Sequence, residues 1–144
     1  LALIRRKWLV IVGWLVIIPA SGFEVFGKLV VYHPGTPVLF YRNTLETHLP
    51  SFYVHTNFSY PSGHLTRTIF LLTVFLLVIL FSKMNSLYKF ISISTILGFG
   101  FMMALTRVYL GEHWVSDVIG GSLLGMAAGM LATSLILAKR KNKV

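Results

Sequence analysis

The sequence contains no cysteine, and it has few charged residues. Of its 144 residues, 12% are charged, and only four are acidic against 13 Lys and Arg. The absence of cysteine excludes disulfides and thiolate-bound metals. Soluble domains carry about a quarter charged residues, so this chain, which is 56% hydrophobic, does not have the composition of one. The net charge of +9 therefore does not indicate nucleic-acid binding, because no soluble domain presents a basic face. The composition predicts an integral membrane protein.

Four long apolar runs are each long enough to cross a bilayer, which takes roughly 17–25 residues per helix. They predict an all-α fold, a single membrane-embedded bundle over residues 1–144 with transmembrane helices at 8–32, 64–81, 90–106 and 116–138. Pro19 predicts a kink in the first helix. The connection over residues 33–63 is long and rich in proline, and loops of this length are often functional.

Basic residues are distributed unevenly between the two ends of the predicted bundle. If the helices alternate in direction, nine cations lie at one end: Arg5, Arg6, Lys7, Lys83, Lys89, Lys139, Arg140, Lys141 and Lys143. The positive-inside rule makes this end, with the C-terminus, cytoplasmic, and we expect a cytoplasmic membrane of the bacterial type. The extracytoplasmic end holds all four acids, all five histidines and the other four cations. The functional groups are thus expected there.

Small residues recur at helical spacing in the last two runs. They are Gly121, Gly125 and Gly129 in the fourth run, and Gly98, Gly100 and Ala104 in the third. Small residues allow helix backbones to approach closely in lipid. We expect both sets to mark helix contacts.

The stretch TRVYLGEHWVSDVIGG contains three residues suited to phosphate chemistry. His113 and Asp117 are four residues apart and can share a helix face. A carboxylate that accepts from one imidazole nitrogen fixes the tautomer and leaves the other nitrogen as a nucleophile. Asp117 could alternatively cap the helix. Arg107 could bind a phosphate through its planar fork or anchor the helix at the interface.

The stretch YPSGH precedes the second apolar run. Ser62 can cap that helix, and Gly63 leaves its backbone N–H accessible. Free N–H groups at a helix N-terminus form an anion site. His64 would lie in the first turn, beside such an anion, although a lone histidine there could also serve only as an interfacial hydrogen-bonding group.

Together, PSGH and the later R-x5-H-x3-D pattern resemble the type 2 phosphatidic acid phosphatase superfamily. This family includes membrane lipid phosphatases such as undecaprenyl-diphosphatase-like enzymes and, more distantly, glucose-6-phosphatases and vanadium haloperoxidases. The resemblance covers about residues 20–138. Family members usually have six helices, so the resemblance implies either that two helices precede Leu1 or that this is a naturally short member.

The family's first motif, K-x6-R-P, is matched only in part by KLVVYHP. Lys28 is in place, but the spacing is two residues shorter and His33 stands where the family has arginine. Either His33 or Arg42 could replace that arginine. Glu24 and Lys28 are spaced for an i,i+4 ion pair.

The resemblance implies a metal-independent, cofactor-free lipid phosphatase with a phosphohistidine intermediate. Its catalytic residues would be His113, His64 and Asp117. The phosphate would be held by Lys28, Arg107, Ser62 and Gly63. Possible further substrate contacts are Arg67, His33 and Arg42.

A site at the membrane interface favours a lipid phosphate or diphosphate as substrate, with membrane lipids as surroundings. Polyprenyl diphosphate, phosphatidic acid and phosphatidylglycerophosphate all fit. The alternatives are a non-catalytic lipid-binding or transport scaffold and a lipid phosphotransferase. Glu46, His48 and His55 receive no role, and the oligomeric state is not predicted.

Overall fold

The computed structural model describes residues 10–40, 42 and 58–137. It contains four helical stretches long and apolar enough to cross a membrane: Val10–Val30, Gly63–Leu80, Ser86–Tyr109 and Val115–Leu137. The last three are α3, α4 and α5, and the first includes α2 (Ile17–Val30). The described residues also include a short 3-10 helix, Val38–Phe40, and no strand. The predicted all-α membrane bundle is confirmed.

Several residues discussed above lie outside the described ranges. They are the terminal cations Arg5, Arg6, Lys7, Lys139, Arg140, Lys141 and Lys143, the loop residues Glu46, His48 and His55, and most of the connection over 33–63. The start of the first predicted helix at Trp8 also lies outside them.

The first span is helical on both sides of Val16, where the helical pattern is interrupted. Pro19 lies three residues later. Because proline has no N–H, it cannot bond to the carbonyl four residues before it, which weakens the helix here. The C-terminal part of the span, α2, brings Glu24 and Lys28 toward the rest of the bundle.

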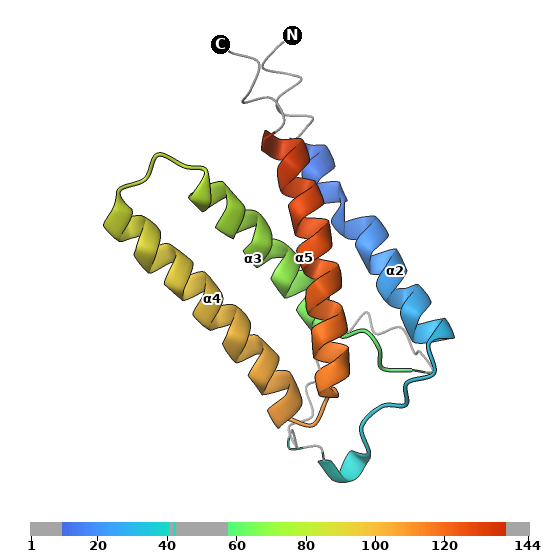
Figure 1. Cartoon of the computed structure of the whole chain (residues 1–144). Coiled ribbons are helices and arrows are strands. Elements are labelled where there is room, and N and C mark those ends of the chain that lie inside the picture. The colour runs from blue at the N-terminus through green and yellow to red at the C-terminus, as the bar shows by residue number, and fades with distance from the viewer. Residues whose placement is uncertain (1–9, 41, 43–57, 138–144) are drawn as a thin grey trace, which may run out of the picture.

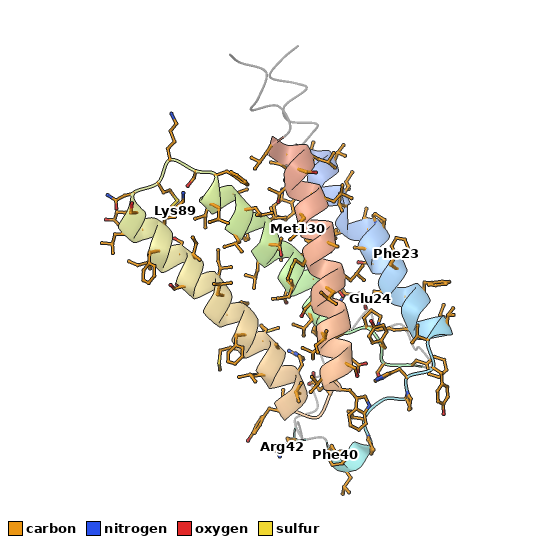
Figure 2. The ribbon with its side chains drawn as sticks, viewed as in Figure 1. Phe23, Glu24, Phe40, Arg42, Lys89 and Met130 are labelled. Carbon is orange, nitrogen blue, oxygen red and sulfur yellow. The ribbon has the colours of Figure 1, made fainter. Side chains whose placement is uncertain are left out.

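Figure 1 shows the four helices running alternately in opposite directions. Helices α3 and α5 form the most extensive contact, with α2 packed against both on one side and α4 on the other. The end of α2, the start of α3, the end of α4 and the start of α5 therefore meet at one end of the molecule. Figure 2 shows Arg42 at this end and Lys89 at the opposite end.

The close packing of α3 against α5 depends on the glycine stripe of α5. A Cβ on Gly121 would lie 2.3 Å from the Ser62 carbonyl oxygen, and one on Gly125 would lie 2.4 Å from that of Thr66. Both distances are too short, so the stripe lets the two backbones touch. The prediction for Gly98 is wrong, because a Cβ there meets nothing within 4 Å.

The boundaries of α4 differ from the predicted range of 90–106. The helix begins at Ser86 because the Asn85 side chain caps it, accepting a hydrogen bond of 2.9 Å from the Leu87 N–H. It continues to Tyr109, so Arg107 lies within its last turn. The apolar run alone did not include these polar helical ends.

Candidate active site

His113 and Asp117 come together at the start of α5. His113 lies in the loop before the helix, and its Nδ1 is 3.3 Å from Oδ2 of Asp117. The same oxygen accepts a hydrogen bond of 3.1 Å from the Trp114 backbone N–H. Asp117 is completely buried. Its Oδ2 therefore contacts both the backbone at the start of α5 and Nδ1 of His113, and Nε2 of His113 takes no part in these contacts.

His64 faces His113 from the first turn of α3. The centroids of the two imidazole rings are 6.4 Å apart, and the ring planes are inclined by 62°. The ring of His64 is exposed while its neighbours in the turn are buried. Two imidazoles at this separation, one from α3 and one from the loop before α5, can act on the same small group.

Ser62 links the start of α3 to the start of α5, because its backbone N–H donates a hydrogen bond of 3.0 Å to the Asp117 carbonyl. It occupies the N-cap position of α3, but the predicted capping bond is wrong, since its hydroxyl makes none. The Oγ atom is buried and has no hydrogen-bond partner among the described residues. A buried hydroxyl without a partner calls for an explanation such as a ligand.

Arg107 reaches the same region from the last turn of α4. One guanidinium nitrogen, Nη1, forms an ion pair with the Glu112 carboxylate. Its Nε is buried and has no partner in the described part of the chain. The backbone of Arg107 also contacts the loop before α5, because its carbonyl accepts a hydrogen bond of 3.3 Å from the His113 N–H. Part of the guanidinium is thus available to an anion.

Glu24 joins two further cations on the α2 side. Its carboxylate lies 3.0 Å from Lys28 Nζ and 3.2 Å from Arg67 Nη2, and the residue is only 2% exposed. The predicted ion pair with Lys28 is confirmed. The carboxylate also lies against Gly63, where a Cβ would come within 2.1 Å of Oε1. Glycine is therefore needed at this position for a steric reason.

His33 lies beside Asp117 on the side away from His113. Its Nδ1 is 3.1 Å from Oδ1 of Asp117 and 3.2 Å from Ser59 Oγ, while its Nε2 is 2.9 Å from Ser116 Oγ. Arg42 is placed differently. Its guanidinium stacks on the ring of Tyr109, the last residue of α4, at 4.4 Å from the ring centroid.

The segment that follows α2 is bound to the loop between α4 and α5. The Thr36 hydroxyl donates to the Gly111 carbonyl, the Trp114 indole donates to the Pro34 carbonyl at 2.9 Å, and the Arg42 N–H donates to the Leu110 carbonyl at 3.0 Å. These bonds hold the loop that carries His113.

A cavity of about 410 Å³ opens beside His113. Apart from His113 and the polar residues Thr36 and Arg42, its lining is mainly apolar and aromatic, including Leu39, Phe40, Tyr109 and Trp114.

The predicted site residues thus form two neighbouring groups. One comprises His113, Asp117, His64, Ser62, Arg107 and His33, and the other comprises Lys28, Arg67 and Gly63 around Glu24. Arg42 stands apart from both.

Sequence reasoning missed three features: the pairing of Glu24 with Arg67, that of Glu112 with Arg107, and the hydroxyls of Ser59 and Ser116 on His33. Only the Arg107–Glu112 pair is local, with its members five positions apart, whereas the other contacts join residues 26 to 83 positions apart.

The chain was also compared with known proteins. No curated protein and no solved structure matches it. A model of the PAP2 superfamily matches residues 26–141, a range that includes Lys28, the PSGH stretch and the R-x5-H-x3-D pattern. The match covers far more than half of the sequence, and the chain therefore belongs to the PAP2 superfamily.

Proposed function

We propose that this protein hydrolyses the phosphomonoester or diphosphate of a membrane lipid through a phosphohistidine intermediate. Membership of the PAP2 superfamily supports phosphatase-type activity in general. The observation that carries the finer proposal is the pair of imidazoles, His64 and His113, whose ring centroids are 6.4 Å apart beside the buried, unpartnered Ser62 Oγ and Arg107 Nε.

In the first step, Nε2 of His113 attacks phosphorus. A P–N bond forms as the P–O bond to the leaving group breaks, and His64 gives its proton to the departing oxygen. Asp117 holds Nδ1 of His113 and balances the positive charge on the ring.

In the second step, His64 takes a proton from water, and the resulting hydroxide oxygen attacks phosphorus. The P–N bond breaks, inorganic phosphate leaves, and both histidines return to their starting states. His64 thus acts first as a general acid and then as a general base.

Charge on the phosphoryl oxygens needs stabilisation in both steps, because phosphoryl transfer depends mainly on positioning and electrostatics. We assign this role to Arg107, Ser62, Lys28 and the Gly63 amide. The donors left without a partner, Arg107 Nε and Ser62 Oγ, are available to it. Arg67, on the α2 side, and Arg42 are proposed as contacts to more distant parts of the substrate.

The position of these residues at the ends of helices long and apolar enough to cross a membrane supports a lipid substrate. A phosphate there is reached most directly when its hydrophobic tail stays in the bilayer. The apolar cavity beside His113 supports an apolar group next to the reacting phosphate. Polyprenyl diphosphate, phosphatidic acid and phosphatidylglycerophosphate are the substrates to test.

Phosphate release by detergent-solubilised protein tests the proposal directly. We expect the wild type to release phosphate from at least one of the three lipids and the His113→Ala variant to release none above background. With ³²P-labelled substrate, the wild type should carry acid-labile label that His113→Ala lacks.

Two outcomes would contradict the proposal, and each would favour a different function. Equal, background release by wild type and His113→Ala would favour a non-catalytic lipid-binding scaffold. Transfer of the label to an added alcohol in place of water would favour a lipid phosphotransferase.

A further inference from the structure

Asp117 has two carboxylate oxygens in different surroundings. Oδ2 is held by His113 and by the Trp114 backbone N–H. Oδ1 is buried and accepts no well-directed hydrogen bond from the described residues. Since an unpartnered buried carboxylate oxygen is costly, the groups beside Oδ1 are of interest.

One of these groups is the imidazole of His33, with Nδ1 at 3.1 Å from Oδ1. On the other side of the ring, Nε2 lies 2.9 Å from the Ser116 hydroxyl. A hydroxyl can donate to an unprotonated nitrogen, whereas a carboxylate only accepts. These two neighbours favour the tautomer with the proton on Nδ1, directed toward Asp117.

Ser59 is the other group near Nδ1, at 3.2 Å. Its hydroxyl lies 3.2 Å from the His33 carbonyl, to which it can donate, so its oxygen is free to accept. The Nδ1 atom of His33 is thus hydrogen-bonded to Ser59 Oγ, and Oδ1 of Asp117 lies beside it at 3.1 Å. A small rotation of the ring would direct the Nδ1 proton fully at the carboxylate.

We infer that His33 is a positioning residue that holds Asp117 from the Oδ1 side, so that Oδ2 remains on the nucleophile His113. The inference rests on the proposed phosphohistidine function. Asp117 would then lie between two imidazoles, one reactive and one structural. His33 would act through Asp117 and not by direct contact with the phosphate.

Steady-state kinetics separate this role from phosphate binding. In His33→Ala we expect kcat to fall on the order of 100-fold, because a displaced catalytic group loses its attack geometry. KM and the inhibition constant of inorganic phosphate should stay within about twofold, since no phosphate contact is lost.

Conservative variants test which nitrogen matters. The side-chain amide of His33→Asn can replace Nδ1–H, whereas that of His33→Gln extends toward the Nε2 position. We expect His33→Asn to recover most of kcat and His33→Gln to remain impaired. Tyr32→Phe, a change at the neighbouring exposed residue, is the matched control and should keep wild-type kinetics.

A second readout does not depend on turnover. In protein carrying ¹⁵N-labelled histidine, the NMR shifts of His113 report which ring nitrogen bears the proton. We expect Nδ1–H in the wild type, a mixture of tautomers in His33→Ala, and recovery of Nδ1–H in His33→Asn.

An unchanged His113 tautomer in His33→Ala would overturn the inference, as would a loss of activity expressed only in KM. If the wild type released no phosphate from any lipid but the tautomer changed as expected, the proposed function would fail while the positioning role would stand.

Discussion

Two carboxylates pair with three cations of the candidate site. Glu112 pairs with Arg107, and Glu24 pairs with both Lys28 and Arg67. These pairs fix long, flexible side chains before substrate arrives, which lowers the entropy that binding must remove. They also reduce the net positive charge near the phosphate. At this scale, the site is a set of oriented donors with moderate charge.

Replacing Arg107 by lysine should impair activity even though the charge is kept. Lysine offers a single ammonium on a flexible stem and cannot reproduce both the Glu112 pair and the buried Nε donor. We expect kcat/KM to fall on the order of 100-fold in phosphate release. Lys89→Arg, a charge-conserving change at the opposite end, is the control. Retention of most activity in Arg107→Lys would make Arg107 an interface anchor only.

Glu24→Gln should lower stability, because Lys28 and Arg67 lose the carboxylate they share. Since Arg67 is largely exposed and keeps water, the cost should be modest, about 1–2 kcal/mol. Thermal unfolding in detergent measures it. Phe23→Leu, at the adjacent and exposed position, should leave the midpoint nearly unchanged. An unchanged midpoint in Glu24→Gln would mean that the three charges are independent.

Helix packing positions the two histidines. His64 lies in the first turn of α3 and His113 precedes α5, so their separation depends on how closely these helices approach. The glycine stripe of α5 controls that approach, and the Ser62 N–H bond to the Asp117 carbonyl fixes the register at the site. A substitution in the middle of the bundle that alters α3–α5 packing should therefore change the separation of the two histidines.

Gly125→Ala should destabilise the bundle and reduce activity together. The added methyl would lie 2.4 Å from the Thr66 carbonyl oxygen, so the helices must separate. Overpacking of this kind costs about 1–3 kcal/mol, which should appear as a lower unfolding midpoint. Gly98→Ala on α4 is the matched control, because its methyl meets nothing within 4 Å. Equal midpoints for the two variants would show that close α3–α5 contact is not required.

At the scale of the whole molecule, apolar side chains cover the outside of the bundle. Many residues of α4 are exposed, among them Phe90, Leu97, Phe99 and Phe101. A surface of this kind is suited to lipid and would be insoluble in water. The polar groups gather at the end where α3 and α5 begin, which is where a phosphate can enter from the membrane surface.

The distribution of cations predicts that this end is extracytoplasmic. The chain has no cysteine, so single cysteines can be introduced without background. We expect Leu39→Cys, at an exposed position near the site, and Ser86→Cys, at the start of α4, to be labelled from opposite sides of the membrane. Labelling of Leu39→Cys from the cytoplasmic side would reverse the proposed orientation, and labelling of both from one side would contradict the span order.

The sequence by itself determined the fold class, the number of spans and the family, because apolar runs and the spacing of Arg107, His113 and Asp117 are local properties. It also predicted the Glu24–Lys28 pair, which needs only helical periodicity. It did not predict that Glu24 also binds Arg67, or that His33 lies against Asp117. Those contacts join residues 43 and 84 positions apart. Only the packing of α2 and its following segment against α3 and α5 decided them, because no local pattern specifies which distant side chains will meet.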